Sequence, residues 1–144
     1  MDTFFPIEKC AERLYKEYQK HNKLIIAVDF DDTVYDFHSV DTDHKNTIKI
    51  LKECSDMGFF VVIFTASRPD RYDFMKMFLE FYGVKVATVN QNPIDLPYGN
   101  NGKIYYNILL DDRAGLYSAY LTLQMTLHMI KQNKKDEQIP SVSE

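Results

Sequence analysis

The sequence predicts an α/β fold of three layers (α/β/α), with a mainly parallel sheet between layers of helices. Short, continuously apolar runs alternate along the chain with segments whose apolar residues recur at helical spacing. Continuous apolar runs indicate strands buried on both faces, and their alternation with helices indicates parallel strands joined by helical crossovers. The 144 residues, of which 45% are hydrophobic and 26% charged, suit one globular domain.

The chain begins with a predicted helix and the first strand. Pro6 suits the first turn of this helix, and His21 with Asn22 ends it. Residues 24–28 then form a buried strand that leads directly into an acidic segment, and residues 34–43 suit a loop or small hairpin. The residues on the inward face of the helix are Ile7, Cys10, Ala11, Leu14, Tyr15 and Tyr18.

Two further helices flank the second strand. Residues 44–57 carry apolar side chains on one face and are followed by Gly58, which suits a helix terminus. Residues 59–64 form the second buried strand. Residues 70–82 form the third helix, which Gly83 closes.

The last third of the chain contains weaker signals. Residues 84–89 predict a weak strand, and the next strand lies within residues 104–110. Residues 116–130 predict an amphipathic helix, and the charged, polar residues 131–144 predict a disordered tail. The connection over residues 90–102 is predicted to be a loop because it contains Pro93, Pro97, Gly99 and Gly102.

Composition narrows the class of protein. Residues 1–130 are predicted to form one domain, without internal repeat or linker. A net charge of -4 and a pI near 5.5 do not favour a nucleic-acid partner, although local basic patches occur in acidic proteins. Cys10 and Cys54 are too few for a disulfide framework, and we see no signal peptide or membrane-spanning run. We therefore expect a cytoplasmic protein with no membrane partner; the sequence predicts no oligomeric state.

Acidic residues follow the predicted strands where each strand ends. Asp29 and Asp31 come directly after the first strand, and Asp111 and Asp112 follow the last one. The carboxyl ends of parallel strands meet at one edge of a sheet, where ligands bind, so these carboxylates should lie close together. Packed like charges repel, and a hard divalent cation with oxygen ligands relieves the repulsion. The sequence therefore predicts a magnesium site.

These motifs resemble those of the haloacid dehalogenase (HAD) superfamily, whose core is Rossmann-like. Residues 29–33, Asp-Phe-Asp-Asp-Thr after a buried strand, match its first motif, and Thr65 matches the second. Lys103 matches the third, and the acidic pair Asp111 and Asp112 after an apolar strand matches the fourth. The resemblance covers about residues 24–112, with the motifs in the correct order.

The resemblance implies a magnesium-dependent phosphohydrolase acting on small phosphomonoesters, such as nucleotide or sugar phosphates. Asp29 is the implied nucleophile, which forms an aspartyl phosphate, and Asp31 is the implied general acid and base. Magnesium is implied to bind the Asp29 side chain, the Asp31 backbone carbonyl and Asp111, with Asp112 adding a ligand or a water bridge.

The same resemblance implies that Thr65 and Lys103 bind the phosphoryl oxygens. Each has an alternative: Thr65 could cap the following helix, and Lys85 on the preceding strand competes with Lys103. Arg68, close after Thr65, is a candidate for binding a second anionic group of the substrate. The alternative is that Arg68 is a solvent-exposed or structural arginine.

Several other polar or aromatic residues near the motifs are expected to be structural. Asp32 occupies a variable motif position and suits a turn. His38 and His44 lack the spacing of metal ligands, and Tyr105 and Tyr106 are expected to pack on a strand rather than stack on a ligand.

The chain leaves no room for the cap domain that most superfamily members insert after the first or second motif. It therefore resembles a small capless member with an open site. Two alternatives to a small-molecule phosphatase remain: a polynucleotide end phosphatase, and a phospho-accepting module resembling receiver domains. The motif order and Asp31 count against the receiver alternative, because a stable phospho-switch has no use for an adjacent acid and base.

Overall fold

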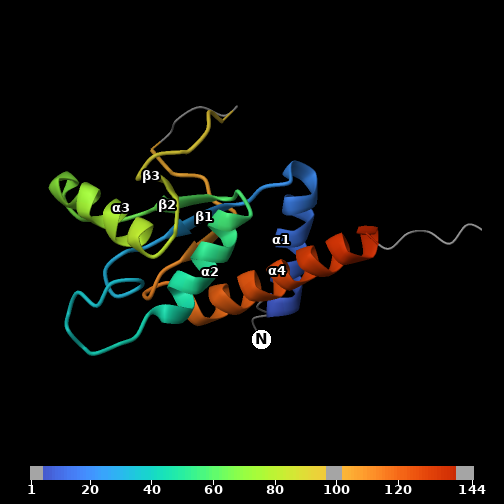
Figure 1. The fold of residues 1–144 in the computed structure, drawn as a ribbon, viewed down its shortest axis with the longest axis horizontal. Helices are drawn as coiled ribbons and strands as arrows, with labels where there is room; N and C mark the ends of the chain where they lie inside the picture. The colour runs from blue at the N-terminus through green and yellow to red at the C-terminus, as the bar shows by residue number, and fades with distance from the viewer. Residues whose placement is uncertain (1–4, 97–101, 139–144) are drawn as a thin grey trace, which may run out of the picture.

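The computed structural model of the chain describes residues 5–96 and 102–138 (Figure 1). Part of the predicted loop, residues 97–101, and the end of the predicted tail, residues 139–144, lie outside the described residues. The elements in order are α1 (Ile7–His21), β1 (Ile25–Val28), α2 (Lys45–Asp56), β2 (Phe60–Ile63), the 3-10 helix η1 (Pro69–Arg71), α3 (Tyr72–Phe81), β3 (Val86–Val89), β4 (Ile108–Leu110) and α4 (Leu116–Gln138).

The four strands form one parallel sheet in the order β3-β2-β1-β4. β1 lies inside the sheet and pairs with β2 on one side, Val28 opposite Ile63, and with β4 on the other, Val28 opposite Leu110. All four residues of β1 are buried, as its continuously apolar sequence predicts. This arrangement confirms the predicted Rossmann-like α/β fold with a parallel sheet.

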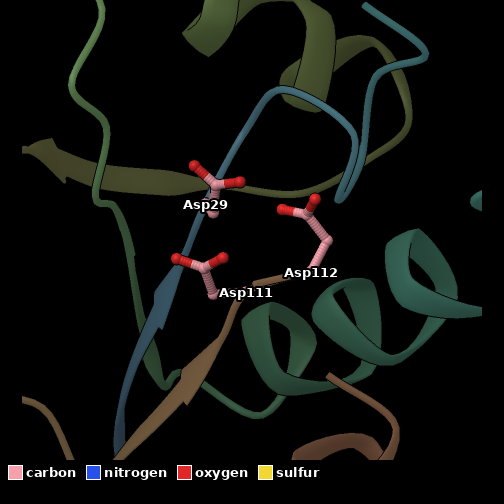
Figure 2. Close-up of side chains that lie close together, drawn as sticks. All are labelled: Asp29, Asp111 and Asp112. Carbon is pink, nitrogen blue, oxygen red and sulfur yellow. The ribbon is translucent and has the colours of Figure 1, made fainter. Parts of the chain in front are cut away.

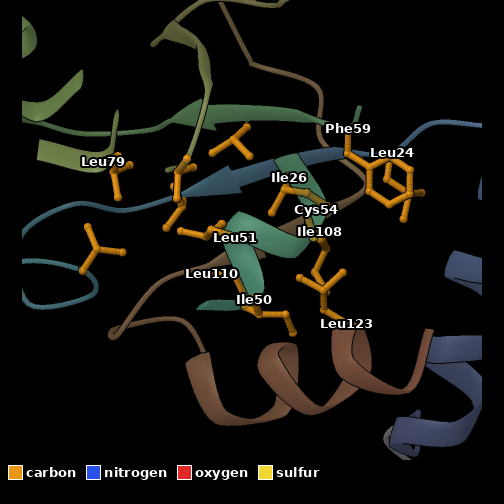
Figure 3. Packing of buried hydrophobic residues seen from close by; sticks show 14 of the residues in the cluster. Leu24, Ile26, Ile50, Leu51, Cys54, Phe59, Leu79, Ile108, Leu110 and Leu123 are labelled. Carbon is orange, nitrogen blue, oxygen red and sulfur yellow. The ribbon is translucent and has the colours of Figure 1, made fainter. Parts of the chain in front are cut away.

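One face of the sheet carries the main hydrophobic core. Alternate strand residues, among them Ile26, Val61 and Ile108, share a buried cluster with side chains from all four helices. Figure 3 shows Leu51 of α2 and Leu123 of α4 within this cluster. The helices therefore hold the sheet mainly from one side.

The opposite face is covered by the connection between β3 and β4. Ile104 of this connection packs on Ile25 and Val62, with Phe60 and Tyr106 half-buried around them. Figure 1 shows the connection on the other side of the sheet from α2 and α4. In the part of this connection that the structure describes, the third layer is thus an irregular segment without helix or strand.

Local sequence explains where the helices end. The backbone of Asn22 is left-handed, with φ of 57°, and its N–H donates to the Tyr18 carbonyl 2.6 Å away, so α1 ends as predicted. Gly58 and Gly83 also have positive φ, 82° and 86°, directly beyond α2 and α3. The predicted bounds of these three helices are therefore confirmed to within two or three residues.

The end of α4 differs from the prediction. The helix continues to Gln138, so residues 131–138 of the predicted disordered tail are helical. These residues include Lys, Gln and Glu, which favour helices without needing a buried face, and they extend a helix already packed on α1 and β4. Within the described residues, no helix is long and apolar enough to cross a membrane.

Candidate active site

A tight turn after β1 positions the first acidic residues. The Phe30 side chain is fully buried, and its carbonyl accepts hydrogen bonds from the N–H groups of Thr33, Val34 and Tyr35 at 3.0–3.3 Å. Asp32 takes a left-handed conformation with φ of 62°, which lets the chain reverse here. Asp29 thus remains at the end of the buried strand while the chain folds back over it.

Three carboxylates meet at the carboxyl edge of the sheet. Asp29 directly follows β1, and its N–H donates to the carbonyl of Leu110, the last residue of β4, at 2.9 Å. Asp111 and Asp112 follow at once. One oxygen from each of the three carboxylates lies within 4.8 Å of the others. Figure 2 shows the three groups turned toward a shared space.

A buried threonine hydroxyl joins the two strands at this point. Thr33 is fully buried, and its Oγ1 lies 3.1 Å from Asp29 Oδ2 and 3.1 Å from Asp112 Oδ1. The same oxygen accepts a hydrogen bond from the Asp112 N–H at 3.0 Å. A hydroxyl has one proton, so it donates to one carboxylate at a time. Thr33 therefore sets the spacing of Asp29 and Asp112 without neutralising both.

The crowding of carboxylates changes the acidity of Asp29. The pKa of its carboxyl is raised from 3.8 to about 7, mainly because the group is partly buried, and to a smaller extent by the hydrogen bond with Asp112 and the charge of Asp111. Hydrogen bonds with Thr33 and with the Phe30 backbone act in the opposite direction. The site therefore favours an added positive charge, either a proton or a cation.

Asp31 is held apart from this trio by an arginine. Arg71, the last residue of η1, donates from Nη1 to Asp31 Oδ2 at 2.7 Å and from Nη2 to Asp31 Oδ1 at 3.0 Å. Ser67 completes the contact, because its hydroxyl donates to Asp31 Oδ2 at 3.2 Å and accepts from Arg71 Nη1 at 2.7 Å. A two-point pair of this kind fixes the orientation of the carboxylate.

Thr65 follows β2 and lies in the same pocket as Asp29. Its Oγ1 accepts a hydrogen bond from the Ser67 N–H at 3.0 Å within the loop, but neither η1 nor α3 has a side-chain cap, so the alternative role of Thr65 as a helix cap is not borne out. Asn90, just beyond β3, accepts from the Thr65 N–H at 2.8 Å and donates to the Thr65 carbonyl at 2.7 Å. The ends of β2 and β3 are thereby fixed to each other.

The loop after the first motif covers one side of the pocket. Asp32 accepts a hydrogen bond from the His38 N–H at 3.3 Å and also contacts the His38 ring nitrogen Nδ1. This contact with His38 lowers the pKa of Asp32. Asp32 thus has the predicted turn role, while His38, expected to be uninvolved, lines the pocket. The ring of Phe37 lies under the Arg71 guanidinium, 5.1 Å from its centroid.

The resulting pocket has a volume of about 540 Å³ and opens to solvent. The predicted residues that line it are Asp29, Asp31, Thr65, Asp111 and Asp112, so the structure brings all of these together. Asp32, Phe37, His38, Phe64, Ala66, Ser67 and Arg113 also line it.

Three predicted cations do not reach this pocket. Lys103 is exposed and does not line the pocket. Its neighbours Gly102 and Ile104 border a separate cavity on the sheet face opposite the helices. Lys85 stands just before β3, at the opposite end of that strand, where its N–H donates to the Ser55 hydroxyl. The Arg68 side chain is 85% exposed and pairs with Asp70 at 3.5 Å. The structure therefore does not place the predicted phosphate-binding lysine in the site.

Sequence reasoning missed the cations that the structure does bring near the acidic residues. Arg71 contacts Asp31, and Arg113 lines the pocket while its N–H donates to Asp111 Oδ1 at 2.8 Å. Arg113 makes no ion pair with any described residue. Its position directly after Asp112, the last residue of the fourth motif, was the available signal.

Comparisons with known proteins agree with the fold. No protein-family model matches the sequence, and neither does any curated protein sequence. The chain is similar to the solved structure of a conserved protein from Bacteroides thetaiotaomicron, with a TM-score of 0.57 and 20% identity. The match covers 83% of this chain and 99% of the other. At this identity the similarity shows a shared fold.

Proposed function

We propose that the protein is a magnesium-dependent phosphohydrolase that cleaves phosphomonoesters through an aspartyl phosphate on Asp29. The observation that carries this proposal is the convergence of Asp29, Asp111 and Asp112 at the edge of the sheet. The arrangement of the first and fourth motifs supports it, since their strands lie side by side. We also propose a cytoplasmic setting, which suits the free thiols of Cys10 and Cys54.

The donor set fits a hard divalent cation. All three groups are carboxylates, whose oxygens suit Mg²⁺, and their closest oxygens lie within 4.8 Å of one another. The raised pKa of Asp29 indicates that nearby protein cations leave the negative charge there uncompensated. Asp29, Asp111 and Asp112 are the proposed ligands, together with the Asp31 backbone carbonyl. Bound magnesium would supply charge neutralisation for the phosphoryl group.

Asp29 then performs the first chemical step. One of its carboxylate oxygens attacks phosphorus in line, forming the bond from Asp29 to phosphorus as the ester bond breaks. The hydrogen bond from Thr33 and the β1–β4 pairing hold this carboxylate in position. The leaving oxygen takes a proton from the protonated form of Asp31. Water next attacks the aspartyl phosphate, gives its proton to Asp31 and releases inorganic phosphate.

Asp31 must exchange partners during this cycle. In the free protein both of its oxygens accept hydrogen bonds from Arg71, which orients the carboxylate. To donate a proton to the leaving oxygen, one of these oxygens must give up its hydrogen bond with Arg71. Its oxygens also lie beside the pocket, so a leaving group seated there can replace one of these hydrogen bonds. The Thr65 hydroxyl and the Arg113 guanidinium are the proposed contacts for the phosphoryl oxygens, with Arg113 in the role that the family resemblance implied for Lys103.

Phosphate release from a generic aryl phosphate and a panel of nucleotide and sugar phosphates tests the proposal. We expect turnover with Mg²⁺, none with EDTA, and a loss of at least about a thousandfold in Asp29→Asn. Asp56→Asn is the matched control, because Asp56 pairs with Lys52 on the surface of α2 and does not line the pocket. Stable phosphorylation by a small phosphodonor without turnover would instead support the receiver-like alternative.

A further inference from the structure

Two aromatic rings border the acidic pocket and remain exposed. Phe37, in the loop after β1, is 51% exposed, and Phe64, directly after β2, is 39% exposed. Both line the pocket that contains Asp29. Other exposed aromatic side chains, such as Phe81 on α3, do not line it. The pocket therefore has two partly exposed phenyl rings in its lining together with the acidic residues.

The Phe37 ring is held in place before any ligand binds. The Arg71 guanidinium lies over one face of the ring, 5.1 Å from the centroid, and Arg71 is itself fixed by its two contacts with Asp31. The His38 ring meets Phe37 edge-on, at 5.1 Å between centroids and 88° between planes. Because Arg71 lies over one face, a flat ligand would stack on the other face. A ring held this way loses little entropy when a flat group stacks on it.

We propose that Phe37 and Phe64 form a stacking site for a flat aromatic leaving group. This inference rests on the proposed function and narrows its substrate class to nucleoside monophosphates and aryl phosphates, rather than simple sugar phosphates. Phe37 lies against Arg71, which contacts Asp31, the proposed donor to the leaving oxygen, so the leaving group is the part of the substrate that this ring can meet. Phe64 lines the same pocket. Aromatic stacking of a base on a protein ring favours binding by about ten- to a hundredfold.

The test compares kcat/KM for adenosine 5′-monophosphate and ribose 5-phosphate, which share the phosphoryl group and the sugar and differ by the base. We expect a preference of about ten- to a hundredfold for the nucleotide, reduced to a few-fold in Phe37→Leu and in Phe64→Leu. Phe81→Leu is the control, because Phe81 is 84% exposed on α3 and does not line the pocket. A third substrate, phosphotyrosine, distinguishes a nucleotide base from an aryl leaving group. A higher kcat/KM for the nucleotide than for phosphotyrosine would identify a base as the stacked group, and a higher kcat/KM for phosphotyrosine would identify an aryl group.

The outcomes separate this inference from the proposed function. If ribose 5-phosphate is turned over as well as the nucleotide, the stacking inference is refuted while the phosphatase function stands. If no substrate is turned over, the function fails, and stacking is tested by calorimetry of the wild type with Mg²⁺. Equal affinities for the nucleotide and ribose 5-phosphate would then refute it, whereas tighter nucleotide binding that Phe37→Leu weakens would support it.

Discussion

The raised pKa of Asp29 makes a defined prediction for stability in the absence of metal. The carboxyl titrates near 3.8 in an unfolded chain and at about 7 in the folded protein. Between these values the folded state holds a proton that the unfolded state has lost. The free energy of unfolding therefore falls as pH rises from about 4 to about 7, and the loss persists above pH 7. Asp29→Asn removes this group and should flatten that part of the curve.

The size of this change in the free energy of unfolding follows from the difference between the two pKa values of Asp29. Converted in full, the rise in pKa from 3.8 to about 7 would lower the free energy of unfolding by about 4 kcal/mol. Because water enters this open pocket and screens the charges, we expect about 1–2 kcal/mol. In EDTA at pH 8, Asp29→Asn should thus be more stable than the wild type by about 1–2 kcal/mol, with a smaller difference at pH 5. Mg²⁺ should stabilise the wild type at pH 8 and have little effect on the variant.

Urea unfolding followed by circular dichroism, from pH 4 to pH 8 with EDTA or Mg²⁺, measures these differences. Asp56→Asn controls for the loss of any one carboxylate, because that residue is exposed and paired with Lys52. Parallel pH curves for the wild type and Asp29→Asn in EDTA would refute the argument that crowding and burial raise this pKa. An equal magnesium response in both proteins would refute the assignment of Asp29 as a ligand.

Three further substitutions test the packing around the site. Thr33→Val should cost about 1–3 kcal/mol in urea unfolding and weaken magnesium binding measured by calorimetry, because the Asp112 N–H loses its acceptor; unchanged values would contradict the bridging role. Leu79→Ala should cost about 2–5 kcal/mol without altering magnesium affinity, since Leu79 is fully buried in α3 away from the pocket. Gly83→Ala should cost about 1 kcal/mol or more in thermal unfolding, because φ is 86° and the new Cβ would lie 2.9 Å from Lys52 Cε; a neutral change would show that the chain relaxes there.

The parallel sheet and the meeting of Asp29 with Asp111 and Asp112 could be predicted from the sequence for a simple reason. Buried parallel strands appear in the sequence as continuous apolar runs, and their carboxyl ends lie at one edge of the sheet. The residues that follow each run are therefore placed by topology alone. No detail of the side-chain packing is needed for that conclusion.

The cations were harder to predict because loops place them. Residues 69–71 form a 3-10 turn before α3, and that turn directs Arg71 at Asp31 while Arg68, three residues earlier, stays in solvent. Lys103 depends on the path of a crossing connection, whose Ile104 packs on the far face of the sheet. Apolar periodicity carries no information about either path, so Arg71 could not be chosen over Arg68 from the sequence.

The pairing of β1 with β4 also determines when the group of three carboxylates is completed during folding. The contact between Ile25 and Asn107 joins residues 82 positions apart, and that between Thr33 and Asp112 joins residues 79 positions apart. Contacts across such long loops form late, because closing the loop lowers the chain entropy before the new contacts can stabilise the structure. A nascent chain that ends before β4 contains one of the three converging carboxylates and lacks the other two. Metal affinity should therefore arise only when the last strand docks, so it would report on the docking of β4 rather than on the presence of the proposed nucleophile, Asp29.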